Sequence, residues 1–135
     1  MNNNIKIFVS VIGLIILGTI GTVLLRAKSN NIPPAPGKYD VFATCLKDKG
    51  AVFYGAFWCS HCQDQKKLFG SSAKLLPYVE CSTLDASAQL QVCKDKKING
   101  YPTWLLADGT PLPNENSAGV TLETLAAKTS CVLPE

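Results

Sequence analysis

Two cysteines separated by two residues follow directly after a short apolar run, and this arrangement restricts the possible fold more than any other feature of the chain. The apolar run is 51–56, and the cysteine motif is Cys59-Ser60-His61-Cys62. The length and composition of the run predict a buried strand. If Cys62 lies in the first turn of a helix, the unpaired N–H groups of that helix stabilise a thiolate on Cys59. The sequence therefore predicts a redox dithiol at a strand-to-helix junction, with Cys59 as an exposed nucleophile.

The same cysteine spacing also occurs in zinc ribbons, where it supplies half of the metal ligands. A zinc site would need a second close pair of cysteine or histidine ligands. The other cysteines stand singly at positions 45, 81, 93 and 131, and His61 is the only histidine. The pattern therefore favours redox chemistry, and we predict no metal site.

Cys59, Cys62 and His61 are the predicted catalytic residues. Cys62 follows Cys59 by about one helical turn, which is the position of a resolving thiol that attacks a mixed disulfide and releases the substrate. The imidazolium of His61 can stabilise the Cys59 thiolate, which favours an oxidant. The alternatives are an ordinary surface histidine and a purely structural Cys59–Cys62 bridge, although so short a ring removes little chain entropy.

Two motifs resemble the signatures of the thioredoxin superfamily: Trp58-Cys59-Ser60-His61-Cys62 and, some forty residues later, Gly100-Tyr101-Pro102-Thr103. The stretches 54–70, 78–81 and 100–104 look like the thioredoxin-like domain found fused to, or beside, bacterial vitamin K epoxide reductase homologues. The resemblance covers about residues 39–130. It implies an α/β thioredoxin fold, in which helices flank a small mixed sheet.

The same resemblance implies a thiol:disulfide oxidoreductase that acts on cysteine-containing protein substrates in oxidative protein folding. The redox-active Cys59–Cys62 disulfide would serve in place of a separate cofactor. The expected partner that recycles the dithiol is a quinone-linked membrane thiol oxidase of the vitamin K epoxide reductase type.

Trp58, Tyr101 and Pro102 are the predicted substrate-binding residues. The resemblance implies a cis Tyr101–Pro102 bond beside the dithiol, which exposes the backbone of Tyr101 as an edge for substrate. Trp58 and Tyr101 flank the dithiol, and we expect an apolar docking rim from them; the alternative is that both are core aromatics.

The sequence departs from the thioredoxin pattern at one position. Many thioredoxins carry a buried acidic residue six positions before the first motif cysteine, where this chain has Phe53. Glu80, on the next predicted strand, is only a weak substitute candidate. The departure argues against efficient reduction and is compatible with an oxidant.

The N-terminal segment differs in character from the rest of the chain. Ile7 to Leu25 carries no charge and is long enough to cross a bilayer as a helix. We therefore predict a single-pass membrane anchor with a transmembrane helix in residues 1–28, a Pro-rich linker in 29–38 and a thioredoxin-like domain in 39–135. A cleaved signal peptide is the alternative, but the apolar run is longer than usual and Arg26-Ala27-Lys28 is a poor cleavage site.

Cysteine usage predicts the compartment. Six cysteines, an even number, suit an oxidising environment, so we expect the domain on the extracytoplasmic, periplasmic side of the cytoplasmic membrane. Three of the 13 basic residues flank the predicted anchor, which leaves 10 basic against 10 acidic residues. Since no basic stripe is present, we expect no binding of nucleic acid.

Periodicity and turn residues predict the elements of the domain. The predicted helices are a first one capped by Asp40, then 59–69, then 86–96, then one through Leu122, Leu125 and Ala126. The predicted strands begin at Ala51 and cover 76–81 and 103–107, and the 110–120 loop holds at most a short edge strand. Adjacency of these elements favours the disulfides Cys81–Cys93 and Cys45–Cys131, although four cysteines allow three connectivities.

Three other functions are compatible with parts of the pattern. One is an anchored copper(I) metallochaperone with Cys59 and Cys62 as ligands, although Met1 is the only methionine and His61 the only histidine that could add a further ligand. The second is a thioredoxin-like reductant of extracytoplasmic disulfides. The third is a non-catalytic module that binds peptides at the Tyr101–Pro102 edge.

Overall fold

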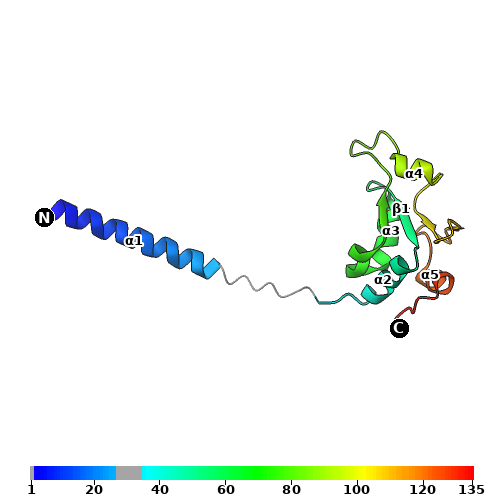
Figure 1. The fold of residues 1–135 in the computed structure, drawn as a ribbon, viewed down its shortest axis with the longest axis horizontal. Helices are drawn as coiled ribbons and strands as arrows, with labels where there is room; N and C mark the ends of the chain where they lie inside the picture. Colours follow the sequence, from blue (N-terminus) through cyan, green and yellow to red (C-terminus); the bar gives the residue numbers. More distant parts are fainter. Residues whose placement is uncertain (1, 27–34) are drawn as a thin grey trace. The chain divides into compact units, whose positions relative to one another are not determined.

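The computed structural model describes residues 2–26 and 35–135, and the side chains of residues 20–26 lie outside this description. The chain divides into two compact units, residues 1–34 and residues 35–135 (Figure 1). Most of the predicted linker, from residue 29 to residue 34, lies outside the described residues.

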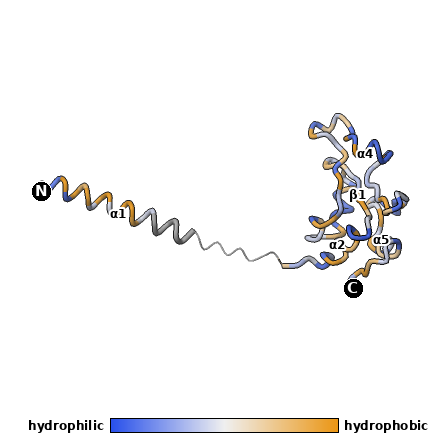
Figure 2. Tube along the Cα trace, in the orientation of Figure 1, coloured by the Kyte–Doolittle hydropathy of each residue, from blue (hydrophilic) through white to orange (hydrophobic). Residues whose placement is uncertain are grey.

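The first unit contains one helix, α1 (Asn3–Arg26), within its described part. Figure 2 shows apolar residues along its N-terminal half, and large side chains there such as Phe8 and Leu14 are exposed. Among the described residues, no helix combines the length and the apolar character that a membrane crossing requires. The transmembrane helix predicted over Ile7 to Leu25 is therefore not supported.

The second unit is built on a four-stranded sheet with the order β2-β1-β3-β4. Its strands are β1 (Val52–Gly55), β2 (Tyr78–Glu80), β3 (Thr103–Leu105) and β4 (Pro111–Leu112). Strand β1 is parallel to β2 and antiparallel to β3, and β3 is antiparallel to β4. This is the small mixed sheet that the sequence predicted, with β1 in an interior position.

The helices of this unit are α2 (Asp40–Asp48), α3 (Ser60–Leu68), the 3-10 helix η1 (Gly70–Leu75), α4 (Gln91–Asp95) and α5 (Leu122–Thr129) (Figure 1). Their order along the chain agrees with the prediction. Asp40, however, does not cap α2. It is the first residue of the helix, and its side chain accepts a hydrogen bond from the Gly37 N–H group at 2.9 Å.

The predicted helix over 86–96 is wrong in its first half, because α4 begins only at Gln91. Asp85 accepts hydrogen bonds from the hydroxyl of Thr83 and from the N–H and hydroxyl groups of Ser87, which stabilises a turn instead of a helix. Ala86 then has a φ of 57°, in the left-handed region. A local side-chain turn thus replaces the helix that the apolar spacing suggested.

The core beneath the sheet is aromatic. The rings of Phe53 and Trp104 stack at 5.1 Å between centroids, and those of Phe42 and Phe69 stack at 5.9 Å. All four side chains are fully or almost fully buried. Trp104 is therefore a core residue, as expected. Phe53 is also part of the core, at the position where many thioredoxins have an acidic residue.

Two disulfides close the second unit, and both pairs are those favoured by element adjacency. Cys45 in α2 is bonded to Cys131, which follows α5, and Cys81 after β2 is bonded to Cys93 in α4. The first bridge joins residues 86 positions apart, and the second joins residues 12 positions apart. The longer closed loop removes more conformational entropy from the unfolded chain.

We therefore predict unequal effects from removing the two bridges. The double substitution Cys45→Ser with Cys131→Ser should lower the free energy of unfolding by roughly 4 to 5 kcal/mol, and Cys81→Ser with Cys93→Ser by roughly 3 kcal/mol. Denaturant unfolding of residues 35–135 measures both. Equal losses, or a larger loss for the second pair, would contradict the chain-entropy explanation.

Candidate active site

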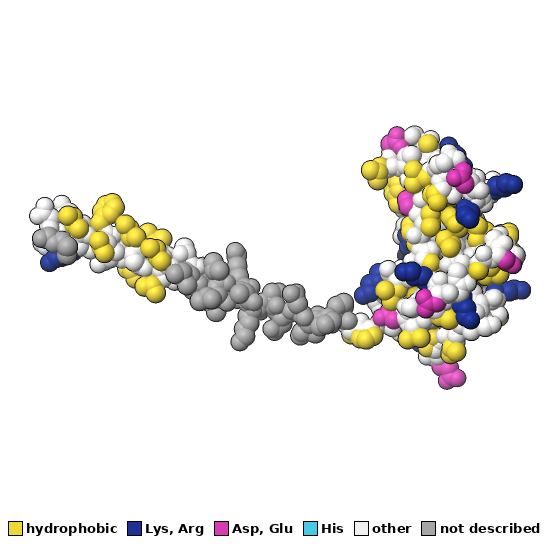
Figure 3. Space-filling view, in the orientation of Figure 1, with side chains coloured by type: hydrophobic (Ala, Val, Ile, Leu, Met, Phe, Trp, Pro, Cys, Tyr) yellow, Lys and Arg dark blue, Asp and Glu magenta, His cyan; other side chains and the backbone are white. Residues whose placement is uncertain are grey.

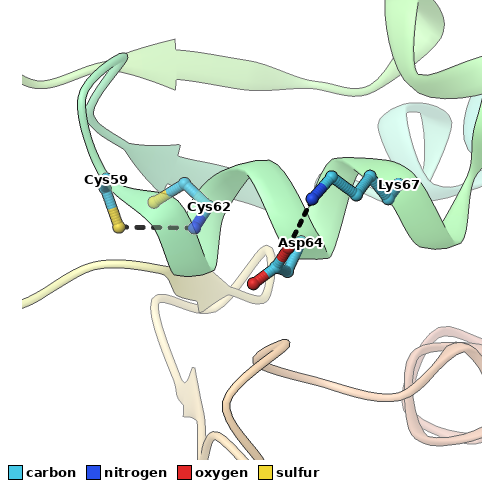
Figure 4. A network of polar contacts seen from close by, with 4 residues as sticks. All are labelled: Cys59, Cys62, Asp64 and Lys67. Carbon is cyan, nitrogen blue, oxygen red and sulfur yellow. Dashed lines mark hydrogen bonds and ion pairs between the residues drawn. The ribbon is translucent and has the colours of Figure 1, made fainter.

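The dithiol lies at the point where the chain leaves β1 and enters α3 (Figure 4). Cys59 is the N-cap of α3, with extended backbone angles, and its Sγ accepts a hydrogen bond from the Cys62 N–H group at 3.3 Å. Both cysteines are free thiols. The sulfur of Cys59 thus occupies the place that a hydroxyl or carboxylate oxygen usually takes at a helix N-terminus, where negative charge is stabilised.

The Cys59 sulfur is more buried than the sequence suggested. Cys59 is only 7% exposed, so the prediction of an exposed nucleophile is wrong in this respect. Its Sγ lies 3.7 Å from the carbonyl oxygen of Tyr101, on a segment that is distant in sequence. The neighbouring side chains of Phe57 and Trp58 are instead exposed, by 46% and 54%.

Burial acts strongly on Cys62, whose side chain is fully enclosed. The pKa of this thiol is raised to about 12, first by loss of hydration and second by its hydrogen bond with Cys59. Gly55 makes this position possible, because a Cβ atom there would lie 3.0 Å from the Cys62 Sγ and 2.9 Å from the Tyr78 ring. Cys62 is therefore a thiol, not a thiolate, over the ordinary pH range.

Trp58 directly precedes Cys59, and Tyr101, whose carbonyl oxygen lies 3.7 Å from the Cys59 sulfur, directly precedes Pro102. A role of the three residues in substrate binding stays a prediction. The Tyr101–Pro102 peptide bond is cis. The rings of Trp58 and Tyr101 meet edge to face at 6.0 Å between centroids. Half of Trp58 is exposed, and Tyr101 is partly buried, so an aromatic surface with one solvent-facing side borders Cys59.

His61 is in the first turn of α3 and is exposed. The hydrogen bonds of Cys59 in the described structure go to Cys62 and Tyr101, not to the imidazole. The pKa of the Asp64 carboxyl group is lowered chiefly by the 2.8 Å contact with Lys67 (Figure 4) and to a smaller extent by the charge of His61.

Glu80 has a larger part in the site than sequence reasoning gave it. Its carboxylate accepts hydrogen bonds from the N–H groups of Phe57, at 3.2 Å, and Ser82, at 2.9 Å, and from the Tyr78 hydroxyl at 2.8 Å. Burial, and then this hydrogen bond, raise the pKa of Tyr78. Glu80 therefore holds the turn before Cys59 against the end of β2.

Gln65 and Gly119 make contacts near the site that the sequence analysis missed. The fully buried amide of Gln65 exchanges two hydrogen bonds with the backbone of Val120, at 2.8 and 2.9 Å. Gly119 has a φ of 92°, and a Cβ atom there would lie 2.9 Å from the Pro102 ring. A polar residue three positions after Cys62, on the inner face of its helix, was the available signal for this contact between α3 and Val120.

Metal ligands are not clustered in the described structure. Within residues 2–26 and 35–135, no group of three or more His, Cys, Asp or Glu side chains is placed to hold a metal ion.

Comparison with known proteins gives a family match and several relatives. The family model described as Thioredoxin matches residues 38–130. A thiol-disulfide oxidoreductase from Arabidopsis thaliana, LTO1, is 48% identical over 67 residues, which are 47% of this chain and 18% of that protein. The thioredoxin domain-containing protein 5 homolog of Drosophila melanogaster is 35% identical over 71 residues, 50% of this chain and 17% of that protein. The matched region thus spans less than a fifth of each of these relatives.

We predict that the two thiols differ sharply in reactivity. Because burial raises the pKa of Cys62 to about 12, it stays protonated near neutral pH, and iodoacetamide should alkylate Cys59 first. Mass spectrometry of the reduced protein, digested at intervals, measures the order. Cys62→Ala should keep the fast phase and Cys59→Ala should lose it; similar rates for the two thiols would contradict the burial described above.

Proposed function

The chain belongs to the thioredoxin family, and on this basis we propose that it is a thiol:disulfide oxidoreductase acting in oxidative protein folding. Support comes above all from one geometric observation, that Cys59 caps α3 and accepts the Cys62 N–H group while lying 3.7 Å from the Tyr101 carbonyl. The proposal assigns the Cys59 sulfur as the nucleophile, the Cys62 sulfur as the resolving thiol and the Tyr101 backbone as the edge for substrate. The name of the Arabidopsis relative agrees with this activity.

The proposed reaction starts from the Cys59–Cys62 disulfide. A substrate thiolate attacks the Cys59 sulfur, which forms a mixed disulfide and breaks the bond to Cys62. Cys62 leaves as a thiolate and takes up a proton, as its raised pKa requires. A second substrate thiolate then attacks the substrate sulfur of the mixed disulfide and releases Cys59. The substrate loses two electrons and two protons and gains a disulfide, while the enzyme becomes the dithiol.

We infer that the protein works as an oxidant. The first-turn N–H group of Cys62 and the positive end of α3 stabilise the Cys59 thiolate, and therefore the reduced enzyme. His61, in the same turn, adds positive charge when it is protonated. Phe53 is fully buried at the position where many thioredoxins have an acid, so no carboxylate base occupies that position. These features favour transfer of a disulfide to substrate.

The reduction potential tests this direction. We predict a value above the approximately −270 mV of thioredoxin, measured by equilibration of the domain with glutathione. His61→Ala should shift the potential toward that of thioredoxin, because it removes a charge that stabilises the reduced form. A potential at or below about −270 mV would instead favour the reductant among the alternatives.

We further propose that the domain works on the extracytoplasmic side of a membrane and is recycled by a quinone-linked thiol oxidase of the vitamin K epoxide reductase type. The two disulfides outside the dithiol suit an oxidising compartment. For attachment to the membrane, support comes from the sequence, in the uncharged run Ile7 to Leu25. The face in Figure 3 shows charges of both signs scattered over the domain, without a basic stripe for nucleic acid.

A single labelling experiment tests location and partner together. A membrane-impermeant thiol reagent applied to intact cells should label Cys59 after mild reduction, because the active dithiol is kept oxidised. When the partner oxidase is inactivated, the same residue should be labelled without prior reduction, since reoxidation has stopped.

The control is the Cys59→Ser variant, which should give no signal from the nucleophile. Labelling only after lysis would place the domain in the cytoplasm and refute the location. Unchanged labelling after loss of the oxidase would refute the partner alone. Release of the protein by carbonate washing would refute attachment to the membrane.

A further inference from the structure

A pocket of about 220 Å³ lies next to the dithiol and is not used by the mechanism above. It is formed by the aromatic pair and by the loop after β2; the lining residues are Trp58, Ser82, Ala86, Ser87, Ala88, Gln89 and Tyr101. Tyr101 belongs to both sites, because its carbonyl oxygen lies 3.7 Å from the Cys59 sulfur. A peptide joined to Cys59 and lying along the Tyr101 backbone therefore passes close to this pocket.

The walls of the pocket are held in place by specific contacts. The Trp58 indole N–H donates to the Ser82 hydroxyl at 2.8 Å. The loop is closed by the hydrogen bond from the Thr83 N–H group to the Ala88 carbonyl, at 2.9 Å, and by that from the Leu90 N–H group to the Cys81 carbonyl, at 2.7 Å. Because the Cys81–Cys93 disulfide fixes the base of the loop, the pocket is a preformed feature.

The lining contains no charged side chain. The carboxylate of Asp85, in the same loop, is occupied by the hydroxyls of Thr83, at 2.6 Å, and Ser87, at 2.8 Å. A charged substrate side chain would therefore lose hydration in the pocket without gaining an opposite charge. This favours an uncharged occupant.

Two polar groups define that occupant further. The Gln89 side-chain NH₂ group donates both of its protons, to the Ile98 carbonyl at 2.8 Å and to the Tyr101 hydroxyl at 2.9 Å. Its carbonyl oxygen is left as an acceptor, and the Tyr101 hydroxyl, which already accepts, keeps its own proton to donate. A side-chain amide offers one acceptor and one donor to such a pair.

We propose that this pocket binds the side-chain amide of an Asn or Gln that lies within two residues of the reacting cysteine in a protein substrate. The assignment rests on the proposed oxidoreductase function and adds a substrate preference to it. Two residues of extended chain span about 7 Å, so the flanking side chain reaches beyond the Cys59 contact while the cysteine stays engaged.

Oxidation of synthetic peptides tests the preference. Each peptide contains two cysteines, and Gln, Glu or Leu is placed one or two positions before or after the first of them. The oxidised wild-type protein should show a kcat/KM at least about fivefold higher for Gln than for Glu or Leu at one of these positions, as expected for two added hydrogen bonds in a partly open site. Ala88→Trp, which fills the pocket from an exposed position, should reduce the ratio to about one.

The matched control is Ala127→Trp, an equal increase in size at an exposed position of α5, which should keep both the rate and the preference. Equal rates for the three residues in the wild-type protein would overturn the pocket assignment, and so would a preference for Leu or Glu. A Gln preference that survives Ala88→Trp would place the selectivity elsewhere. If the protein oxidised neither dithiothreitol nor a single one of the peptides, the proposed function itself would be refuted.

Discussion

The second unit depends on one local constraint, the change from extended to helical backbone at Cys59. The residue must keep extended angles so that its sulfur can accept the Cys62 N–H group, yet α3 must begin with the next residue. An apolar strand alone does not hold such a turn. Glu80 fixes the chain before the turn through the Phe57 N–H group, and Gln65 fixes the helix after it through Val120. The dithiol is thus held on both sides by polar contacts, an exposed one before the turn and two buried ones after it.

Local patterns were sufficient to predict the order of elements and the position of the dithiol, because each depends on apolar periodicity or on the spacing of two residues. The mixed sheet was expected from the resemblance to thioredoxins. Local patterns failed where a polar side chain or a distant segment decides the structure. Asp85 replaces the first turns of a predicted helix with a side-chain turn. Cys59 is covered by the carbonyl of Tyr101, a contact between residues 42 positions apart. Neither effect has a signature in the apolar pattern.

The substitution at Phe53 shows how packing and chemistry compete for one position. Its ring stacks on Trp104 and meets Tyr78 edge to face, so the centre of the sheet is entirely aromatic at this level. A carboxyl group there would need a partner or would be protonated. The acidic group near the dithiol is instead Glu80, at the end of β2, where three hydrogen-bond donors satisfy it. This chain thus lacks the buried carboxyl group of many thioredoxins, and its acidic residue near the dithiol, Glu80, orders the active-site turn instead.

The two kinds of cysteine are connected through this geometry. Glu80 directly precedes Cys81, so the residue that holds the active-site turn is adjacent to a disulfide in the chain. The same disulfide closes the loop that lies against Trp58, and Trp58 directly precedes Cys59. An environment that reduced the Cys81–Cys93 bridge would therefore loosen both the turn and the pocket beside it. Oxidising conditions keep Cys59 and Cys62 in the disulfide form. By this reasoning they also maintain the surface on which the substrate is recognised.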